Sequence, residues 1–228
     1  MSGNPSRSRS RIVPYRLYAL APLSGAYPVI LVSHGIGGLR EAMPYLVRRL
    51  AESGYMAVHL QHTGTDSSIW QHANSLAEVC RILREAMWDA NAARARFQDV
   101  PFALRELARM NGEGRLAGRL DLTPIGMAGH SYGGVSTMVA AGQRMGPGGQ
   151  WFFKEPRIRA GLVMSPNIPV QGGELVALYR DMRIPQFTSR AREMAMRCPQ
   201  QGIRSDTTDP SLRSADHPPS ISARSRLC

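Results

Sequence analysis

Short apolar runs of strand length alternate with segments of helical periodicity over residues 28–164. The run at residues 28–33 is continuous and rich in β-branched side chains, which is typical of a strand buried on both faces of a parallel sheet. Helical spacing is clearest for Met43, Leu46 and Leu50. We predict strands at residues 11–20, 28–33, 55–60, 124–128 and 158–164, and helices at residues 41–53, within 75–110 and from 135 to 143. This alternation predicts a doubly wound α/β fold.

Four details refine that outline. Pro14 marks the first strand as an edge strand, because proline has no N–H for a central ladder. Residues 75–110 predict two helices separated near residues 98–101, which makes Asp99 a helix-boundary residue. Cys80 lies in the first of these helices and is interpreted as a buried small hydrophobic side chain. Short connections between the strands predict parallel pairing with right-handed crossovers.

Both ends of the chain lack the apolar pattern. Residues 1–10 are rich in Ser, Arg and Pro and are predicted to be disordered. Residues 187–228 contain no apolar run of strand length, which predicts an atypical, disordered tail. We therefore expect one α/β domain at residues 11–186, with its C-terminal strands missing or disordered. We interpret the tail as an altered C-terminus, such as a frameshifted reading, which resequencing of the coding region would test.

Charge and cysteine content argue against several classes of function. The net charge of +11 comes almost wholly from arginines spread along the chain, with Lys154 as the only lysine, and this distribution argues against nucleic-acid binding. The cysteines, Cys80, Cys198 and Cys228, are too widely spaced for a zinc or redox pair, so no metal is expected. No apolar run is long enough to span a bilayer and no secretory signal is present, so a cytoplasmic protein is expected.

A Gly-x-Ser-x-Gly pentapeptide, Gly129-His130-Ser131-Tyr132-Gly133, follows a predicted buried strand and precedes a predicted helix. A nucleophile elbow requires this placement, because the tight turn presents the serine Oγ at the edge of the sheet. Glycines on either side allow the strand and the helix to approach closely. The pattern therefore predicts Ser131 as the nucleophile, and His130 is interpreted as a residue that packs beside the elbow.

A second glycine-rich turn, residues 34–38 (HGIGG), follows the strand at residues 28–33. A serine hydrolase needs N–H donors for the developing oxyanion, one from the residue after the nucleophile and one from an earlier strand-to-helix loop. We predict Tyr132 and Ile36 as these donors, with His34 and Gly35 supporting the loop. A phosphate cradle is disfavoured, because neither a Walker lysine nor a GxGxxG pattern is present.

Three segments in this order, YPVILVSHGIGG, ESGYMAVHLQHTGTDSS and GRLDLTPIGMAGHSYGG, resemble bacterial α/β hydrolases related to dienelactone hydrolase and platelet-activating-factor acetylhydrolase. The resemblance covers residues 11–186. It implies an α/β-hydrolase fold, with a mostly parallel sheet flanked by helices. It also implies a serine esterase that acts on a small carboxylic ester without metal or organic cofactor, through Ser131, Ile36 and Tyr132. Residues 62–68 would line the acyl or alcohol pocket. A serine in place of a cysteine nucleophile favours the acetylhydrolase-like branch.

The catalytic acid and histidine have no convincing position in the sequence. In this fold they follow the serine, and His217 is the only histidine after Ser131. It lies in a Pro-rich stretch and is interpreted as a solvated residue of the tail, with Asp206 and Asp209 as still weaker candidates for the acid. Asp66 precedes the serine and is interpreted as a loop residue.

Two functions follow from these observations. The first is a serine hydrolase of carboxylic esters that forms an acyl-enzyme on Ser131, with activity impaired by the altered C-terminus. The alternative is a non-catalytic α/β-hydrolase-like protein that binds a ligand or partner at the retained pocket. The physiological ester, the acyl chain length and the oligomeric state are left open by the sequence.

Overall fold

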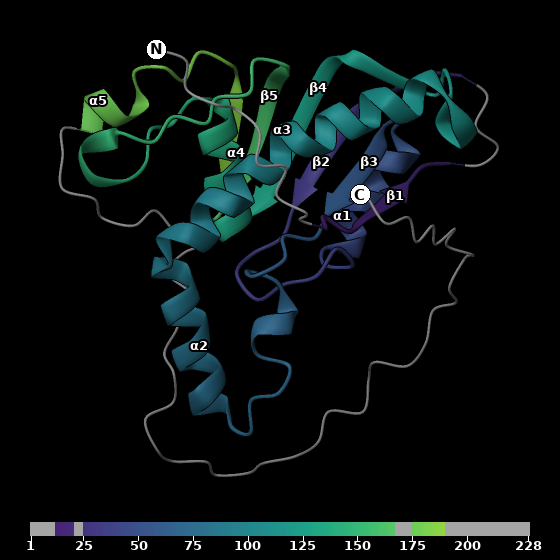
Figure 1. Ribbon diagram of the computed structural model, residues 1–228. Helices are drawn as coiled ribbons and strands as arrows, with labels where there is room; N and C mark the ends of the chain where they lie inside the picture. Colours follow the sequence, from purple (N-terminus) through teal and green to yellow (C-terminus); the bar gives the residue numbers. More distant parts are fainter. Residues whose placement is uncertain (1–11, 21–24, 167–174, 190–228) are drawn as a thin grey trace, which may run out of the picture.

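A six-stranded sheet forms the centre of the protein (Figure 1). The computed structural model describes residues 12–20, 25–166 and 175–189. The strands are β1 (Tyr15–Tyr18), β2 (Tyr27–Ser33), β3 (Met56–Leu60), β4 (Leu120–His130), β5 (Ile158–Met164) and β6 (Gln186–Ser189). Their order across the sheet is β1-β3-β2-β4-β5-β6. All neighbouring pairs are parallel except β1 and β3, so the predicted mostly parallel sheet is confirmed.

Each predicted strand is present. The strand predicted at residues 158–164 matches β5 in both bounds, and β1 is the antiparallel edge strand that Pro14 indicates. Strand β4 begins four residues before the predicted 124–128 and ends two residues after it. A second difference lies at the end of the sheet. Strand β6 pairs with β5 through Ser189, so three residues assigned to the tail form strand. Residues 1–10, Cys198, Cys228 and the rest of the predicted tail lie outside the described residues.

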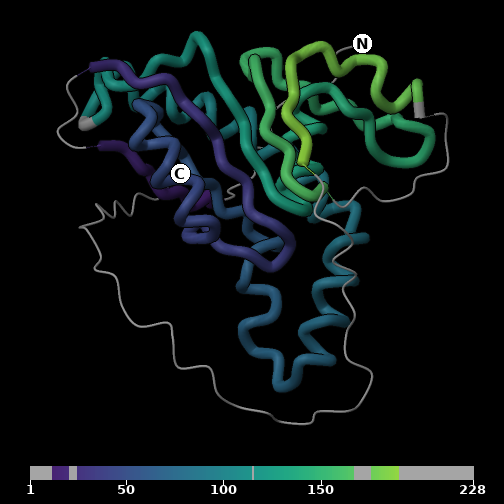
Figure 2. Tube along the Cα trace, turned by 180° about the vertical axis from the view of Figure 1, so that it is seen from behind, coloured from purple at the N-terminus to yellow at the C-terminus, as the bar shows by residue number. Residues whose placement is uncertain are grey.

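Helices cover both faces of the sheet. They are α1 (Pro44–Glu52), α2 (Leu76–Trp88), α3 (Ala90–Gly112), α4 (Tyr132–Ala141) and α5 (Leu175–Tyr179), with short 3-10 turns at Ser67–Ile69, Gly114–Leu116 and Pro147–Gly149. Alternate residues of β2 separate the two faces. Leu31 packs in the core beneath α3, whereas Val32 packs with Val47 of α1. Figures 1 and 2, which view the molecule from opposite sides, show α3 and α1 on these two faces.

The break between α2 and α3 was predicted at the wrong place. It falls at Asp89, whose extended backbone ends α2 and whose side chain accepts hydrogen bonds from Asn91 N and Ala92 N at the start of α3. Pro101 lies inside α3, and Asp99 is therefore a buried residue of that helix, not a boundary residue. Apolar residues on both sides of Pro101 are buried against the sheet, and their packing outweighs the hydrogen bond that proline cannot donate.

Helix α2 projects beyond the sheet, on the side where β2 and β4 end (Figures 1 and 2). None of its residues is fully buried. Cys80 is accordingly half-buried, which corrects its interpretation as a core residue. The contact of α2 with the body of the protein includes Leu83, which lies over Gly37 of the loop that follows β2.

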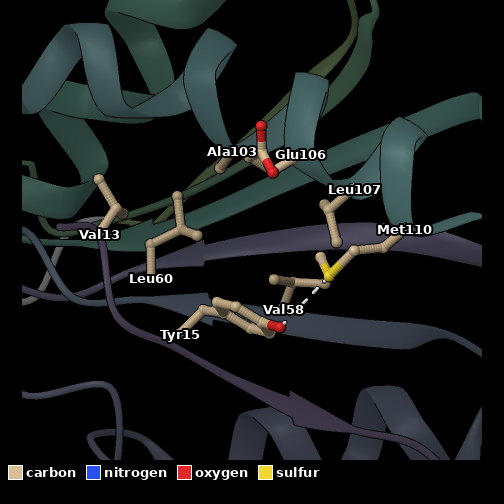
Figure 3. Close-up of a pocket in the computed structure, with 8 residues that line it drawn as sticks. All are labelled: Val13, Tyr15, Val58, Leu60, Ala103, Glu106, Leu107 and Met110. Carbon is tan, nitrogen blue, oxygen red and sulfur yellow. Dashed lines mark hydrogen bonds between the residues drawn. The ribbon is translucent and has the colours of Figure 1, made fainter. Parts of the chain in front are cut away.

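A small cavity lies between β1, β3 and the second half of α3 (Figure 3). It is lined by Val13, Tyr15, Val58, Leu60, Ala103, Glu106, Leu107 and Met110. The Tyr15 hydroxyl donates to Met110 Sδ across it at 3.5 Å. None of the predicted site residues lines this cavity, and its mainly apolar wall is part of the core beneath α3.

Candidate active site

Ser131 occupies the junction between β4 and α4, where the sequence predicts the nucleophile elbow. Its backbone has φ 55° and ψ −118°, a conformation that a non-glycine residue adopts only under strain. The strand holds one side of the turn, because Ser131 N donates to Met164 O of β5 at 2.9 Å. The helix holds the other side, because Val135 N donates to Ser131 O at 3.2 Å. The half-buried Ser131 side chain is thereby presented at the carboxyl edge of the sheet.

The glycines of the pentapeptide are required by close backbone contacts. A Cβ on Gly129 would lie 2.1 Å from Gly133 O, and one on Gly133 would lie 1.9 Å from Ser33 O. These distances are far below any van der Waals contact, so neither position accepts a side chain. The end of β2, the turn and the first residues of α4 thus meet backbone to backbone.

The predicted oxyanion loop lies directly beside Ser131. A Cβ on Gly35 would be 3.4 Å from Ser131 Cβ and 3.8 Å from Ser131 Oγ, which places this part of the loop in van der Waals contact with the serine. Two residues from the segment after β3 hold this loop at Gly37 by hydrogen bonds. Its N–H donates to Thr65 O at 2.8 Å, and its carbonyl accepts from Trp70 Nε1 at 2.8 Å.

The two predicted donors are available for a ligand. Tyr132 is the first residue of α4, so its N–H has no partner within the helix. Among the contacts between described residues, neither Tyr132 N–H nor Ile36 N–H has a hydrogen-bond acceptor. An oxyanion hole requires unpaired N–H groups near the nucleophile, so both residues remain candidates for this role.

The two histidines beside these motifs differ in their surroundings. His130 is exposed, which corrects its interpretation as a packing residue: at the last position of β4 its side chain leaves the core. His34 is fully buried. Its Nε2 accepts from His62 N at 3.0 Å and its Nδ1 lies 2.6 Å from Gly35 O, which defines a neutral ring protonated at Nδ1. Burial, with the charge of Arg96 nearby, lowers the pKa of His34 far below its usual range.

Beneath the loop and the elbow lies a buried polar cluster that the sequence analysis missed. His62 Nε2 is 2.9 Å from Ser33 Oγ, and His62 Nδ1 is 2.8 Å from Asp99 Oδ2. Arg96 donates to Ser33 Oγ at 2.9 Å and to Thr65 Oγ1 at 2.8 Å. Although Ser33, His62 and Asp99 are spaced like a catalytic triad, Ser33 is wholly inaccessible to solvent and bonded to Arg96, so this serine is closed to a substrate.

The loop at residues 62–68 was predicted to line the substrate pocket. The structure buries His62, Thr65 and Asp66 of this loop, whereas Thr63, Gly64 and Ser68 are exposed. Asp66 accepts from Gln61 Nε2 at 2.7 Å and from Ser68 Oγ at 2.6 Å, which closes the loop on itself. The buried part of the loop therefore supports the site from below.

The structure brings Ser131 together with Ile36, Tyr132, Gly35 and the buried His34. No described side chain forms a hydrogen bond with Ser131 Oγ. His217, Asp206 and Asp209, the candidates for the base and acid, lie outside the described residues. Strand β6 is the last described element, and in this fold the acid and the histidine come after the strand at that place in the order.

Buried histidines make the stability of the protein sensitive to acid. Burial and the charge of Arg96 lower the pKa of His59 to about 4, and both ring nitrogens of this residue are buried without partners. In the unfolded chain a histidine titrates near pH 6.5, so the contribution of His59 is complete above pH ~6.5 and is lost progressively as the pH falls towards ~4. For each such histidine the loss is about 1.4 kcal/mol per pH unit.

We therefore expect His59→Leu to flatten the loss of stability between pH 6.5 and 4 by about 1.4 kcal/mol per unit, and to be neutral or stabilising at pH 7. Urea unfolding at several pH values measures both effects. His72→Leu, at an exposed histidine, is the control and should leave the acid slope unchanged. An equal acid slope for His59→Leu and the wild type would contradict the assignment.

Comparisons with known proteins bear on the fold alone. No family model and no curated protein matches the chain. Among solved structures, a putative dienelactone hydrolase from Klebsiella pneumoniae subsp. pneumoniae is similar, with a TM-score of 0.53 and 19% sequence identity over 77% of this chain. A ferulic acid esterase from Streptomyces cinnamoneus is similar over 64% of this chain, with a TM-score of 0.45 and 22% identity. The protein has the α/β-hydrolase fold.

The likeness is partial in length. This chain spans 65% of the dienelactone hydrolase and 38% of the esterase.

Within the described residues, no helix is both long and apolar enough to cross a membrane. The same part of the chain holds no cluster of three or more His, Cys, Asp or Glu side chains placed to bind a metal ion.

Proposed function

We propose that this protein is a serine hydrolase that acts on small carboxylic esters through an acyl-enzyme on Ser131. The strained backbone of Ser131 carries the proposal. A positive φ at a non-glycine residue costs free energy, and strain of this kind at a serine between a strand and a helix is typical of a nucleophile elbow, which supports the proposal.

The chemistry follows from this arrangement. Ser131 Oγ would attack the ester carbonyl carbon and form a tetrahedral intermediate, whose oxyanion accepts from Ile36 N–H and Tyr132 N–H. Collapse of the intermediate releases the alcohol, which takes up the proton that the serine gave to a general base. Water then attacks the acyl-enzyme and releases the carboxylic acid. His217, with Asp206 or Asp209, remains the candidate source of the base.

Turnover of p-nitrophenyl acetate tests this proposal. We expect the full-length protein to release p-nitrophenol, and Ser131→Ala to lower kcat by about 10³-fold or more, because no other group can form the acyl-enzyme. Ser53→Ala, at an exposed serine after α1, is the matched control and should leave turnover unchanged. Equal turnover by Ser131→Ala and the wild type would overturn the proposal.

One observation favours a second candidate, a non-catalytic protein that binds an anionic ligand at the same place. No described side chain forms a hydrogen bond with Ser131 Oγ to activate it, while the two N–H groups beside it are free to bind an oxygen. This candidate predicts no turnover by the wild type together with saturable binding of short carboxylates, measured by calorimetry. Turnover that depends on Ser131 excludes it.

A further inference from the structure

We propose that Arg96 of α3 is a positioning residue that holds the two halves of the oxyanion hole in register. The inference rests on the proposed function, because it concerns the same N–H groups of Ile36 and Tyr132. Arg96 touches neither of these groups directly. It acts through residues on either side of them.

On the side of the loop, the guanidinium fixes the backbone before and after Ile36. Its Nη2 donates to His34 O and, at 2.9 Å, to Ser33 Oγ at the end of β2. Its Nη1 donates at 2.8 Å to Thr65 Oγ1, and the carbonyl of the same threonine accepts the Gly37 N–H at 2.8 Å. Hydrogen bonds therefore hold the backbone on both sides of Ile36, at His34 O and at Gly37 N–H. These bonds constrain the direction of the Ile36 N–H.

On the side of the elbow, the same guanidinium reaches Tyr132. Arg96 Nε donates to Ser136 Oγ at 2.8 Å, and the Ser136 hydroxyl donates to Tyr132 O at 3.1 Å. The guanidinium carbon also lies 5.0 Å from the centre of the Tyr132 ring, a cation–π contact. One planar group thus links the first turn of α4 to the loop after β2.

Because Arg96 is buried, its N–H groups must find their partners within the protein. Arg96 has no exposed surface, and Ser33, to which it donates, is also bonded to the buried His62. In such surroundings a guanidinium must satisfy its N–H groups in a fixed, planar arrangement, and this restricts what it bonds to. A lysine keeps the charge but has one nitrogen, so it cannot make contacts to the loop, the threonine and α4 together.

Kinetics and hydrogen exchange of full-length Arg96→Lys test the inference. A small displacement of a catalytic group can cost about 10²-fold in rate, so we expect kcat for p-nitrophenyl acetate to fall by about 10²-fold with KM little changed. We also expect faster amide exchange at residues 34–38 and 131–136, and unchanged exchange in β5. Ser136→Ala removes only the link to the elbow, and should lower kcat by about 10-fold and speed exchange mainly at residues 131–136.

Arg105→Met is the control, since Arg105 is exposed on the same helix, and it should match the wild type in both measurements. If Arg96 serves stability alone, Arg96→Lys and Ser136→Ala will unfold more easily but keep the wild-type kcat per folded molecule, and the inference is overturned. Unchanged exchange at residues 34–38 would overturn it as well. If the wild type shows no turnover, the proposed function fails, while the exchange results still decide whether Arg96 holds both segments.

Discussion

Gly133→Ala is expected to yield no stably folded protein. A Cβ at this position would lie 1.9 Å from Ser33 O, 2.6 Å from Ser33 C and 2.8 Å from His34 O. All three are backbone atoms, and the strand end to which they belong lies in the middle of the sheet, between β3 and β4. Relief of the clash would move α4 away from β2 and open the site. We expect a loss of more than about 4 kcal/mol in the free energy of unfolding, which is exceptional for a single methyl group.

Soluble yield and urea unfolding measure this effect. Gly112→Ala is the matched control, because Gly112 ends α3 and a methyl group added there would have no atom within 4 Å, so this variant should be neutral or slightly stabilising. A Gly133→Ala protein as stable as the wild type would mean that β2 and α4 do not meet as described.

Asp99→Ala is expected to destabilise the protein by about 3 kcal/mol, because it leaves the buried N–H of His62 without its acceptor. Asp99 Oδ2 accepts from His62 Nδ1 at 2.8 Å, and both side chains are buried. Without the carboxylate, the His62 ring loses its acceptor. The cost is large because water does not reach this buried region.

Denaturant unfolding compares this variant with two others. Asp99→Asn keeps an oxygen that accepts from His62 and should cost clearly less than the alanine. Glu85→Ala breaks an exposed pair with Arg81 on α2 and should cost only about 0.3–0.5 kcal/mol. Equal costs for Asp99→Ala and Glu85→Ala would show that the buried cluster contributes no more than a surface ion pair.

The elements that the sequence predicted well are those in which one periodicity dominates. A continuous run rich in β-branched residues marks β2, and a short, mostly apolar run marks β5. Pro101 misled the prediction for α3, because a local rule about proline was given more weight than the apolar stripe that continues through Val100 and Leu104. The start of α4 was predicted three residues late, since Ser131 begins this helix from a strained conformation that helix propensities do not describe.

The candidate site could be predicted only where it depends on local geometry. Ser131, Gly129 and Gly133 follow from the constraints of one tight turn, and Ile36 from the loop after one strand. The cluster of Arg96, His62, Asp99 and Ser33 joins residues that are up to 66 positions apart by number (Ser33 to Asp99), and no local pattern connects them. A signal was nevertheless present. Arg96 lies three residues after Ala93 on the apolar stripe of α3, and a charged residue on a buried stripe indicates a buried polar partner.

Covalent labelling of the full-length protein by a fluorophosphonate, located by peptide mass spectrometry, tests the central claim most directly. We predict one adduct per molecule on the peptide that contains Ser131, and none in Ser131→Ala. The buried Ser33 should stay unlabelled in both proteins, although it is bonded to His62. An adduct on another serine, or a wild-type protein that does not react at all, would contradict the assignment of Ser131 as the nucleophile.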